Sequence, residues 1–191
     1  MTKAQWRMVG VLTAVVAVVG LLLAIAYQWS RAPIARAREE ALHRMLLQVL
    51  PPHDNAPART LLQIDGRRLY VARSHGRVVG YAWSLMAPDG YGGPIEILLG
   101  VRPDGAVEAI RVVRHLETPG LGDGIVRNRA WLDSFVGRRL EGTRWAVRKD
   151  GGDFDQFTGA TISPRAVVAA VARGLRWFRD HRAAVGRAAA R

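Results

Sequence analysis

Residues 155–164 read DQFTGATISP, and an alanine-rich apolar run over residues 166–178 follows them. Ser163 is among the residue types that most often cap a helix N-terminus, and Pro164 suits the first helical position. The stretch therefore predicts a helix that begins at Pro164. It also predicts that Thr161 lies just upstream of that helix, with its hydroxyl near the helix N-terminus.

A helix N-terminus presents backbone N–H groups without intrahelical partners and the positive end of the helix dipole, and both favour a phosphate. Gly159 and Ala160 are small enough for a bulky group to approach the backbone closely. The hydroxyl of Thr161 can therefore contact a phosphate or carry one covalently. The alternative is a helix cap rich in Thr and Ser that binds no ligand, and these ten residues alone leave both interpretations open.

The apolar run after this motif has the spacing of one broad helix face. Its large side chains are Val167, Val168, Val171, Leu175 and Phe178. We expect this helix to continue to about residue 180. From residue 181 onward the sequence is rich in Arg and Ala, and we expect this tail to fray.

The chain has 191 residues, 49% of them hydrophobic, which is enough for one domain and an anchor. It has no cysteine, so disulfides and thiolate metal sites are excluded. The formal net charge of +12 comes almost entirely from arginine, and no basic helix interleaved with aromatic residues stands out. The composition therefore argues against a nucleic-acid-binding protein and leaves an acidic partner or an anionic surface open.

Residues 9–27 form a run of 19 residues without a charge, flanked by Trp6, Tyr27 and Trp29. At about 1.5 Å per residue, this run matches the hydrocarbon core of a bilayer. The alternative is a cleaved signal peptide, because residues 24–26 read Ala-Ile-Ala, but the run is long for a signal sequence. We therefore expect an uncleaved anchor, while the arginines on both sides leave its orientation open.

The sequence predicts a helix over residues 31–50, ended by Pro51 and Pro52, and then two antiparallel hairpins. The first hairpin pairs residues 69–73 with 77–85, and the second pairs 95–101 with 106–113 through a Pro-Asp-Gly turn. A short helix is expected over 128–135 and one more strand over 145–148.

Two loops between these strands contain candidate binding residues. Residues 90–94 hold three glycines and a proline, which permits close approach of a ligand, although an ordinary hairpin connection has the same composition. Residues 115–123 carry a histidine, a carboxylate and a hydroxyl at the end of a strand. His115 is a polar loop residue or a general base. No His or Glu recurs at the spacing of metal ligands, so we expect no metal site.

Three stretches in this order closely resemble one family: GYGGPIEILLGV (90–101), HLETPGLGD (115–123) and DQFTGATISP (155–164). The chain resembles the G subunit of the Rnf (Rsx) ion-translocating electron-transport complex over the span and essentially the whole domain. The same FMN-binding domain occurs in the C subunit of the sodium-pumping NADH:quinone reductase. Thr158 and the chain length favour the Rnf type, because the quinone-reductase protein usually has Ser at that position and a longer chain.

The resemblance implies FMN joined to Thr161 through a phosphoester bond. Thr158, Gly159 and Ala160 match the remaining positions of the family's attachment motif. In the family, a separate magnesium-dependent flavin transferase uses FAD, attaches the FMN portion and releases AMP. That enzyme reads an acidic residue three positions before the first Ser/Thr, and Asp155 matches this position.

The resemblance also implies that the second loop lies against the flavin ring. We expect Thr118 and its neighbouring backbone to hydrogen-bond the cofactor, with Leu121 as apolar cover. Glu117 either joins these flavin contacts or is a structural carboxylate that pairs with an arginine. The loop at residues 90–94 is expected to support the site, with a direct flavin contact less favoured.

By the same resemblance, the protein is one electron relay in a bacterial inner-membrane complex that couples ferredoxin:NAD electron transfer to sodium or proton movement. The expected partners are the other membrane subunits and the flavin transferase. The flavin carries the redox chemistry, so no catalytic acid or base is required in this chain. The rival interpretation is a flavin-free anchored domain whose basic face binds an anionic partner.

The expected architecture is α+β: a single transmembrane helix, then a mixed α+β FMN-binding domain with antiparallel hairpins and a C-terminal helix. Residues 1–29 form the anchor, 30–57 a helical linker, 58–181 the FMN-binding domain and 182–191 a basic tail. The family places that domain on the periplasmic side of the membrane.

Overall fold

The computed structural model describes residues 3–190, and the chain divides into two compact units between Ala41 and Leu42. The first unit is the greater part of the helix α1 (Lys3–Val49). Its segment Lys3–Arg31 has a mean hydropathy of 2.8 and is long and apolar enough to cross a membrane. Among the described residues this is the single helix with those properties, as expected from the uncharged run.

The helix α1 is continuous from Lys3 to Val49, so it contains the predicted helix over residues 31–49 as well as the uncharged run. Pro33 lies inside the helix, where it removes one N–H donor without ending the helix. The helix ends just before Pro51, as the sequence predicts.

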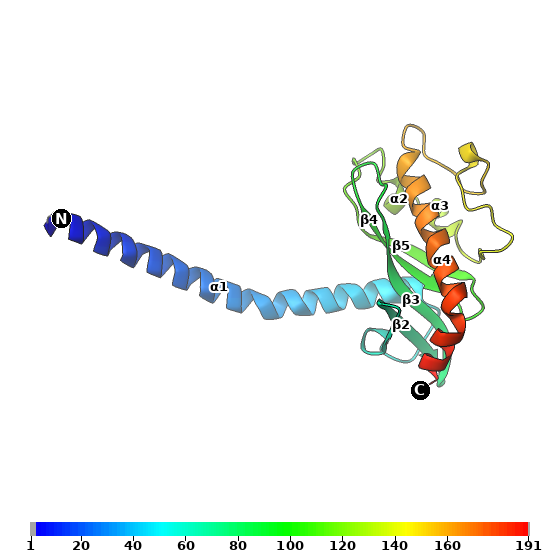
Figure 1. The fold of residues 1–191 in the computed structure, drawn as a ribbon, viewed down its shortest axis with the longest axis horizontal. Coiled ribbons are helices and arrows are strands. Elements are labelled where there is room, and N and C mark those ends of the chain that lie inside the picture. Colours follow the sequence, from blue (N-terminus) through cyan, green and yellow to red (C-terminus); the bar gives the residue numbers. More distant parts are fainter. Residues whose placement is uncertain (1–2, 191) are drawn as a thin grey trace. The chain divides into compact units, whose positions relative to one another are not determined.

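The second unit is built on one five-stranded antiparallel sheet in the order β1-β2-β3-β4-β5 (Figure 1). Its strands are β1 (Leu61–Ile64), β2 (Arg67–Ser74), β3 (Arg77–Ala87), β4 (Ile95–Val101) and β5 (Val107–Arg114). Both predicted hairpins are therefore confirmed. The short edge strand β1, which follows the 3₁₀ turn η1 (Pro57–Arg59), was not expected from the sequence.

The two turns that flank β2 have the geometry favoured in tight hairpins. Asp65 and Gly66 join β1 to β2 with φ angles of 48° and 72°. His75 and Gly76 join β2 to β3 with φ angles of 49° and 75°. Asp54 accepts a hydrogen bond of 2.7 Å from the backbone N–H of His75, which holds this non-glycine residue in a left-handed conformation.

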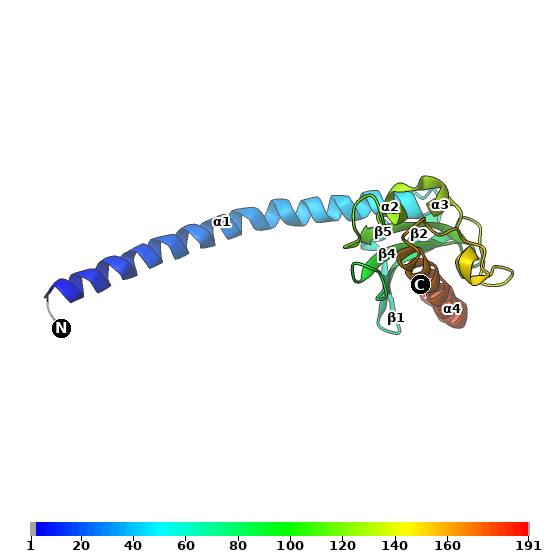
Figure 2. The same cartoon turned by 90° about the horizontal axis from the view of Figure 1, so that it is seen from above.

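The C-terminal helix α4 (Ile162–Ala189) lies across one face of the sheet, where the main core is found (Figure 2). Trp83 of β3 stacks on Phe178 with ring centroids 5.7 Å apart. Gly174 allows the helix to approach this strand, because a Cβ atom there would lie 2.8 Å from Leu85 Cδ1.

The expectation that the chain frays from residue 181 is wrong, because α4 continues to Ala189. Val185 and Ala189 are buried in the core and hold the last turns on the sheet. The guanidinium of Arg73 also donates to the carbonyl oxygen of Ala189, which caps the helix C-terminus.

The opposite face of the sheet is covered by the last turns of α1, which belong to the second unit. Leu46, Val49 and Leu50 pack there against small or apolar strand residues. These strand residues are Ala72, Ala82, Leu98 and Ala109. The approach is closest at Gly100, where a Cβ atom would lie 1.7 Å from the carbonyl oxygen of Val49.

The segment between β5 and α4 contains α2 (Gly124–Arg127), α3 (Arg129–Asp133) and the 3₁₀ turn η2 (Arg148–Asp150). The short helix expected near residue 128 is confirmed, and Asn128 caps α3 through Trp131 N. The strand expected over 145–148 is wrong, because only one isolated bridge, Val147 to Phe154, forms among the described residues there. Trp145 instead stacks on Phe154, and burial against aromatic rings replaces strand pairing.

Candidate functional site

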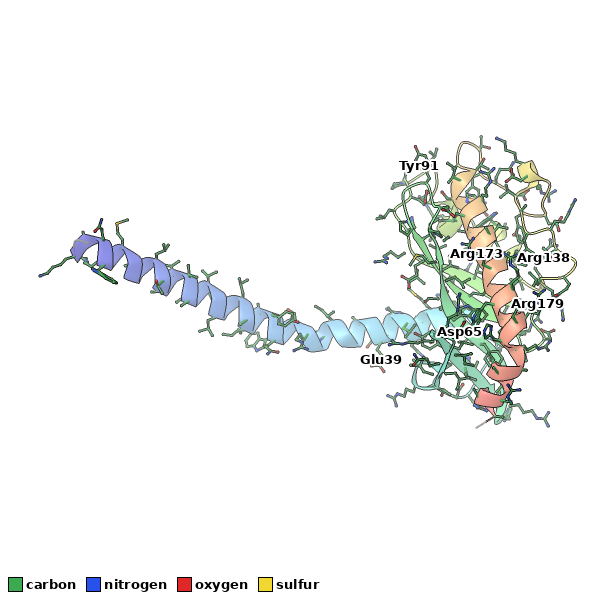
Figure 3. All side chains as sticks on the ribbon, in the orientation of Figure 1. Glu39, Asp65, Tyr91, Arg138, Arg173 and Arg179 are labelled. Atoms are coloured by element: carbon green, nitrogen blue, oxygen red, sulfur yellow. The ribbon has the colours of Figure 1, made fainter. Side chains whose placement is uncertain are left out.

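The three motif segments come together around one pocket of about 120 Å³ in the second unit. Its walls come from the loop before β4, the loop after β5 and the start of α4. The lining residues are Tyr91, Glu117, Thr118, Leu121, Gly122, Gly159, Ala160, Ile162 and Ser163. Tyr91 lies beside the beginning of α4 (Figure 3). Segments that lie far apart in the chain therefore form a single site.

Thr158 and Gly159 form a tight turn just before α4. The N–H of Ala160 donates to the carbonyl oxygen of Phe157 at 3.0 Å, and Gly159 has a φ of 76°. A residue with a side chain is strained at that φ, so glycine is favoured there. The turn leaves Thr158 exposed and directs the chain into the helix at the pocket wall.

Thr161, rather than Ser163, is the N-cap residue of α4. The first intrahelical hydrogen bond runs from Arg165 N to Thr161 O at 3.2 Å. Pro164 has no N–H, so the N–H groups of Ile162 and Ser163 are the donors at this helix end. The Thr161 side chain is half-buried and, within residues 3–190, makes no capping hydrogen bond. Its hydroxyl is therefore available at the N-terminus of the helix.

Ser163 has a different role from the expected cap. It lies within the first turn, is 1% exposed, and donates a hydrogen bond of 2.6 Å to Glu117 Oε2. The helix begins two residues earlier than the N-cap preference of Ser163 predicts, and the serine hydroxyl contacts the second loop instead.

Glu117 is a buried carboxylate, 5% exposed, at the centre of the three segments. Its Oε1 accepts a hydrogen bond of 3.2 Å from Gly92 N, and its Oε2 accepts from Ser163. The alternative of a structural pair with an arginine is not supported, because no ion pair within residues 3–190 includes Glu117. The neutral donors from two other motifs hold this carboxylate instead.

Two glycines permit this close packing. A Cβ atom on Gly122 would lie 2.5 Å from Glu117 Oε2. A Cβ atom on Gly92 would lie 2.0 Å from the carbonyl oxygen of Leu116. The loop at residues 90–94 therefore supports the site, as expected, and it also contributes Tyr91 to the pocket wall.

The other residues of the second loop surround the pocket entrance. The carbonyl oxygen of Thr118 accepts hydrogen bonds of 3.1 Å from the N–H groups of Leu121 and Gly122. Leu121 is half-exposed and lies near Gly159 of the attachment motif. His115 Nδ1 accepts a hydrogen bond of 3.2 Å from Glu117 N, so this ring nitrogen helps to shape the loop.

Sequence reasoning missed Tyr91 and Ile162 as pocket residues. Tyr91 is 68% exposed and Ile162 is 44% exposed, although both side chains are apolar in most of their surface. The glycine-rich context of Tyr91 was a usable signal, because a large aromatic residue between flexible neighbours is well placed to cover a ligand.

Asp155 lies outside the pocket wall. Its exposed carboxylate forms an ion pair with Arg148, with Oδ1 2.5 Å from Nε. Its carbonyl oxygen accepts a hydrogen bond of 2.8 Å from Trp131 Nε1, which fixes the backbone at the start of the motif. The acidic side chain is thus presented on the surface, upstream of Thr161 in the chain.

The residues at the pocket fit a flavin phosphate and part of a flavin ring. Beside the pocket, the hydroxyl of Thr161 and the N–H groups of Ile162 and Ser163 suit the phosphate, while Gly159 and Ala160 leave room beside the backbone. The volume of about 120 Å³ is smaller than that of most small-molecule sites. A group of flavin size would therefore be only partly enclosed.

The segment before α4 is held by carboxylates whose pKa values are lowered. Hydrogen bonds from the Arg165 guanidinium, at 2.6 and 2.9 Å, lower the pKa of Asp150. The backbone N–H of Arg144, followed by its guanidinium, lowers the pKa of Asp153. These ionised side chains therefore stabilise the fold above their ordinary pKa and lose this effect as the pH falls through the folded-state values.

We expect acid to loosen residues 144–155 before the sheet. Below about pH 4, where Asp is ordinarily half-protonated, hydrogen-exchange protection in this segment should fall while that of β3 persists. The measurement is amide exchange by mass spectrometry, corrected for the intrinsic pH dependence. Asp153→Asn should lower protection in the segment already at neutral pH. An equal loss of protection in β3 and in the segment would contradict this prediction.

Known proteins resemble this chain both over the segments that form the pocket and over most of its length. The family model described as FMN-binding domain matches residues 90–176, which include all three motif segments up to the middle of α4. The G subunit of the ion-translocating oxidoreductase complex of Pseudomonas aeruginosa (strain UCBPP-PA14) is 46% identical, over 87% of this chain and 85% of that protein. The protein of the same name from Cereibacter sphaeroides (strain ATCC 17029 / ATH 2.4.9) is 47% identical, over 85% and 79%.

A solved structure has the same fold. The crystal structure of Shewanella oneidensis NqrC matches with a TM-score of 0.51 and 21% sequence identity. The match covers 62% of this chain and 61% of that chain. At this identity the likeness concerns the fold alone.

Proposed function

Because the chain belongs to the family of G subunits of ion-translocating oxidoreductase complexes, we propose that it is a membrane-anchored flavoprotein with FMN attached covalently to Thr161. In this role it relays electrons to and from the redox centres of neighbouring proteins in the complex. The observation that carries the proposal is the convergence of the three motif segments on one pocket beside Thr161.

The attachment we propose is a phosphoester formed from FAD by a separate flavin transferase. The Oγ1 atom of Thr161 forms a bond to the phosphorus of the FMN portion, and the bond between that phosphorus and the AMP oxygen breaks. AMP leaves, and the hydroxyl proton is released. The N-cap position of Thr161 supports this assignment, because the N–H groups of Ile162 and Ser163 favour the remaining negative charge.

Bound FMN supplies the electron-transfer chemistry, and the chain supplies attachment, orientation and electrostatics. We propose that Thr118 and its neighbouring backbone hydrogen-bond the flavin, and that Leu121 covers it on one side. Gly159 and Ala160 leave space for the phosphate arm. Tyr91 and Ile162, which line the same pocket, complete the apolar surroundings.

The experiment that tests this function is an intact mass measurement of the chain expressed with and without an active flavin transferase. We expect a gain of one FMN less one water, located by peptide mapping on the peptide that contains Thr161. No gain, with the transferase active on another target, would leave a flavin-free anchored domain. Salt-dependent binding of an anionic partner would then be the next property to measure.

Asp155 is proposed as the residue that the transferase recognises, since it matches the acidic motif position and its carboxylate is exposed. Asp155→Asn should raise the transferase KM for this chain by about tenfold or more, as expected for a lost charge-assisted contact. The measurement is initial rate of FMN incorporation against chain concentration. Arg148→Gln is the matched control, because it removes the same ion pair and keeps the carboxylate. Equal KM increases in both variants would contradict direct recognition of Asp155.

We also propose a single-pass arrangement in the bacterial inner membrane with the FMN-binding domain on the periplasmic side. Covalent attachment is useful there, because a dissociable flavin would be lost from the compartment. The absence of cysteine makes a labelling test direct. Arg77→Cys, on the exposed β2–β3 hairpin, should react with a membrane-impermeant maleimide in intact spheroplasts, and Lys3→Cys should react only after lysis. The reverse pattern would overturn this orientation.

A further inference from the structure

The carboxylate of Glu117 joins all three motif segments, and the attachment chemistry itself does not require it. It sits in the loop after β5 and receives one hydrogen bond from Gly92 in the loop before β4. It receives a second from Ser163 in the first turn of α4. Burial of a carboxylate is unfavourable unless its oxygens are hydrogen-bonded, so this arrangement constrains both partner segments.

The hydrogen bond between Glu117 and Ser163 also sets Ser163 apart from the two threonine hydroxyls near the start of α4. Ser163 donates its single hydroxyl proton to Glu117 and is almost fully buried, so it is withheld as an acceptor of a phosphoryl group. Thr158 is exposed but precedes the Gly159 turn, three residues before the N-cap of α4. Thr161 alone among these three combines partial exposure with a position at the helix N-terminus.

On the basis of the FMN attachment proposed above, we propose that the hydrogen bond between Glu117 and Ser163 positions Thr161 for modification. The bond fixes the first turn of α4 against the second loop and thereby fixes the position of Thr161, the partly exposed N-cap residue of that helix. Glu117 and Ser163 are positioning residues in this scheme. They act on the geometry of the acceptor, whereas Asp155 acts on recognition of the chain by the transferase.

Glu117→Gln is the sharpest variant, because it keeps the size of the side chain. A glutamine offers one acceptor oxygen, so it cannot accept from both Gly92 N and Ser163 Oγ through separate oxygens. Ser163→Ala removes the same hydrogen bond from the other side. Both variants should retain the fold, which is checked by the thermal melting temperature from tryptophan fluorescence.

The test measures FMN incorporation into the full-length chain in detergent, with purified transferase, FAD and magnesium, by intact mass against time. We expect Glu117→Gln and Ser163→Ala each to lower kcat on the order of tenfold with KM unchanged, because geometry rather than recognition is affected. The double variant should be no slower than the slower single variant, since both changes break one interaction. The contrast with Asp155→Asn, which should change KM, separates positioning from recognition.

Wild-type kcat in both single variants would overturn the inference, as would additive losses in the double variant. If Glu117→Gln does not fold, Ser163→Ala alone tests the inference: a lowered kcat supports it, and an unchanged kcat overturns it. Failure of the proposed function has a different signature, because the wild-type chain itself would then gain no mass. A gain in the wild-type chain together with equal gains in the variants removes only the positioning role.

Discussion

Thr161→Ala should abolish covalent flavin completely, so that the chain expressed with an active transferase keeps its unmodified mass. Thr161 is the N-cap of α4, and its hydroxyl makes no capping hydrogen bond within the part of the chain that the structure describes. Its removal should therefore leave the helix start intact while eliminating the acceptor oxygen. We expect no substitution by the neighbouring hydroxyls, because Ser163 is buried and bonded to Glu117 and Thr158 lies three residues before the helix N-cap.

The matched control is Thr161→Ser, which restores the hydroxyl without the methyl group and should be modified at a rate within about tenfold of the wild-type chain. Colour, fluorescence of the denatured protein band and intact mass report the same event independently. If Thr161→Ala still gains one FMN less one water, the assigned residue is wrong. Peptide mapping of that product would then identify the acceptor.

Gly100→Ala should destabilise the FMN-binding domain more than any other single-methyl addition in β4. The added Cβ would lie 1.7 Å from the carbonyl oxygen of Val49, and that atom is backbone, so no rotamer change relieves the overlap. The last turns of α1 would have to move away and expose part of the second core cluster. We expect a loss of about 3 kcal/mol in the free energy of unfolding, at the upper end of typical overpacking effects.

Gly186→Ala is the control for the same chemical change. Gly186 lies in α4 with nothing within 4 Å of the position of a Cβ atom, so alanine should be neutral or stabilise by about 0.5–1 kcal/mol. Urea unfolding of the full-length chain in detergent, followed by tryptophan fluorescence, compares both variants with the wild type. Equal midpoints for Gly100→Ala and the wild type would show that α1 does not pack on β4 as observed.

Much of the fold was predictable from local patterns. The apolar runs of β2 to β5, the Pro-Asp-Gly turn and the apolar stripe of α4 each have a short-range signature in the sequence. The attachment motif was equally local, since the small residues at Gly159 and Ala160, the hydroxyl of Thr161 and the following helix start lie within a few positions. The family resemblance came from the same three stretches.

The misassigned segments depended on contacts that are distant in sequence. Residues 145–148 have the composition of a strand. In the structure, however, the ring of Trp145 packs against Phe154 and Phe135. Burial against these rings outweighs pairing with a sheet edge. The end of α4 is rich in Arg and Ala, and Val185 and Ala189 remain helical because the sheet buries them. The helix or strand propensity of a segment does not include the free energy of its contacts with distant parts of the chain.

Sequence alone predicted the site and its setting: one long apolar helix, an α+β domain, and a threonine between two small residues and a helix. The tertiary structure determined which hydrogen-bond partners the neighbouring side chains have. Glu117 and Ser163 are 46 positions apart, and their hydrogen bond of 2.6 Å joins the loop after β5 to the first turn of α4, whose N-cap is Thr161. A buried carboxylate takes whichever donors the folded chain brings to it, so its partners follow from packing rather than from the residues beside it in the chain.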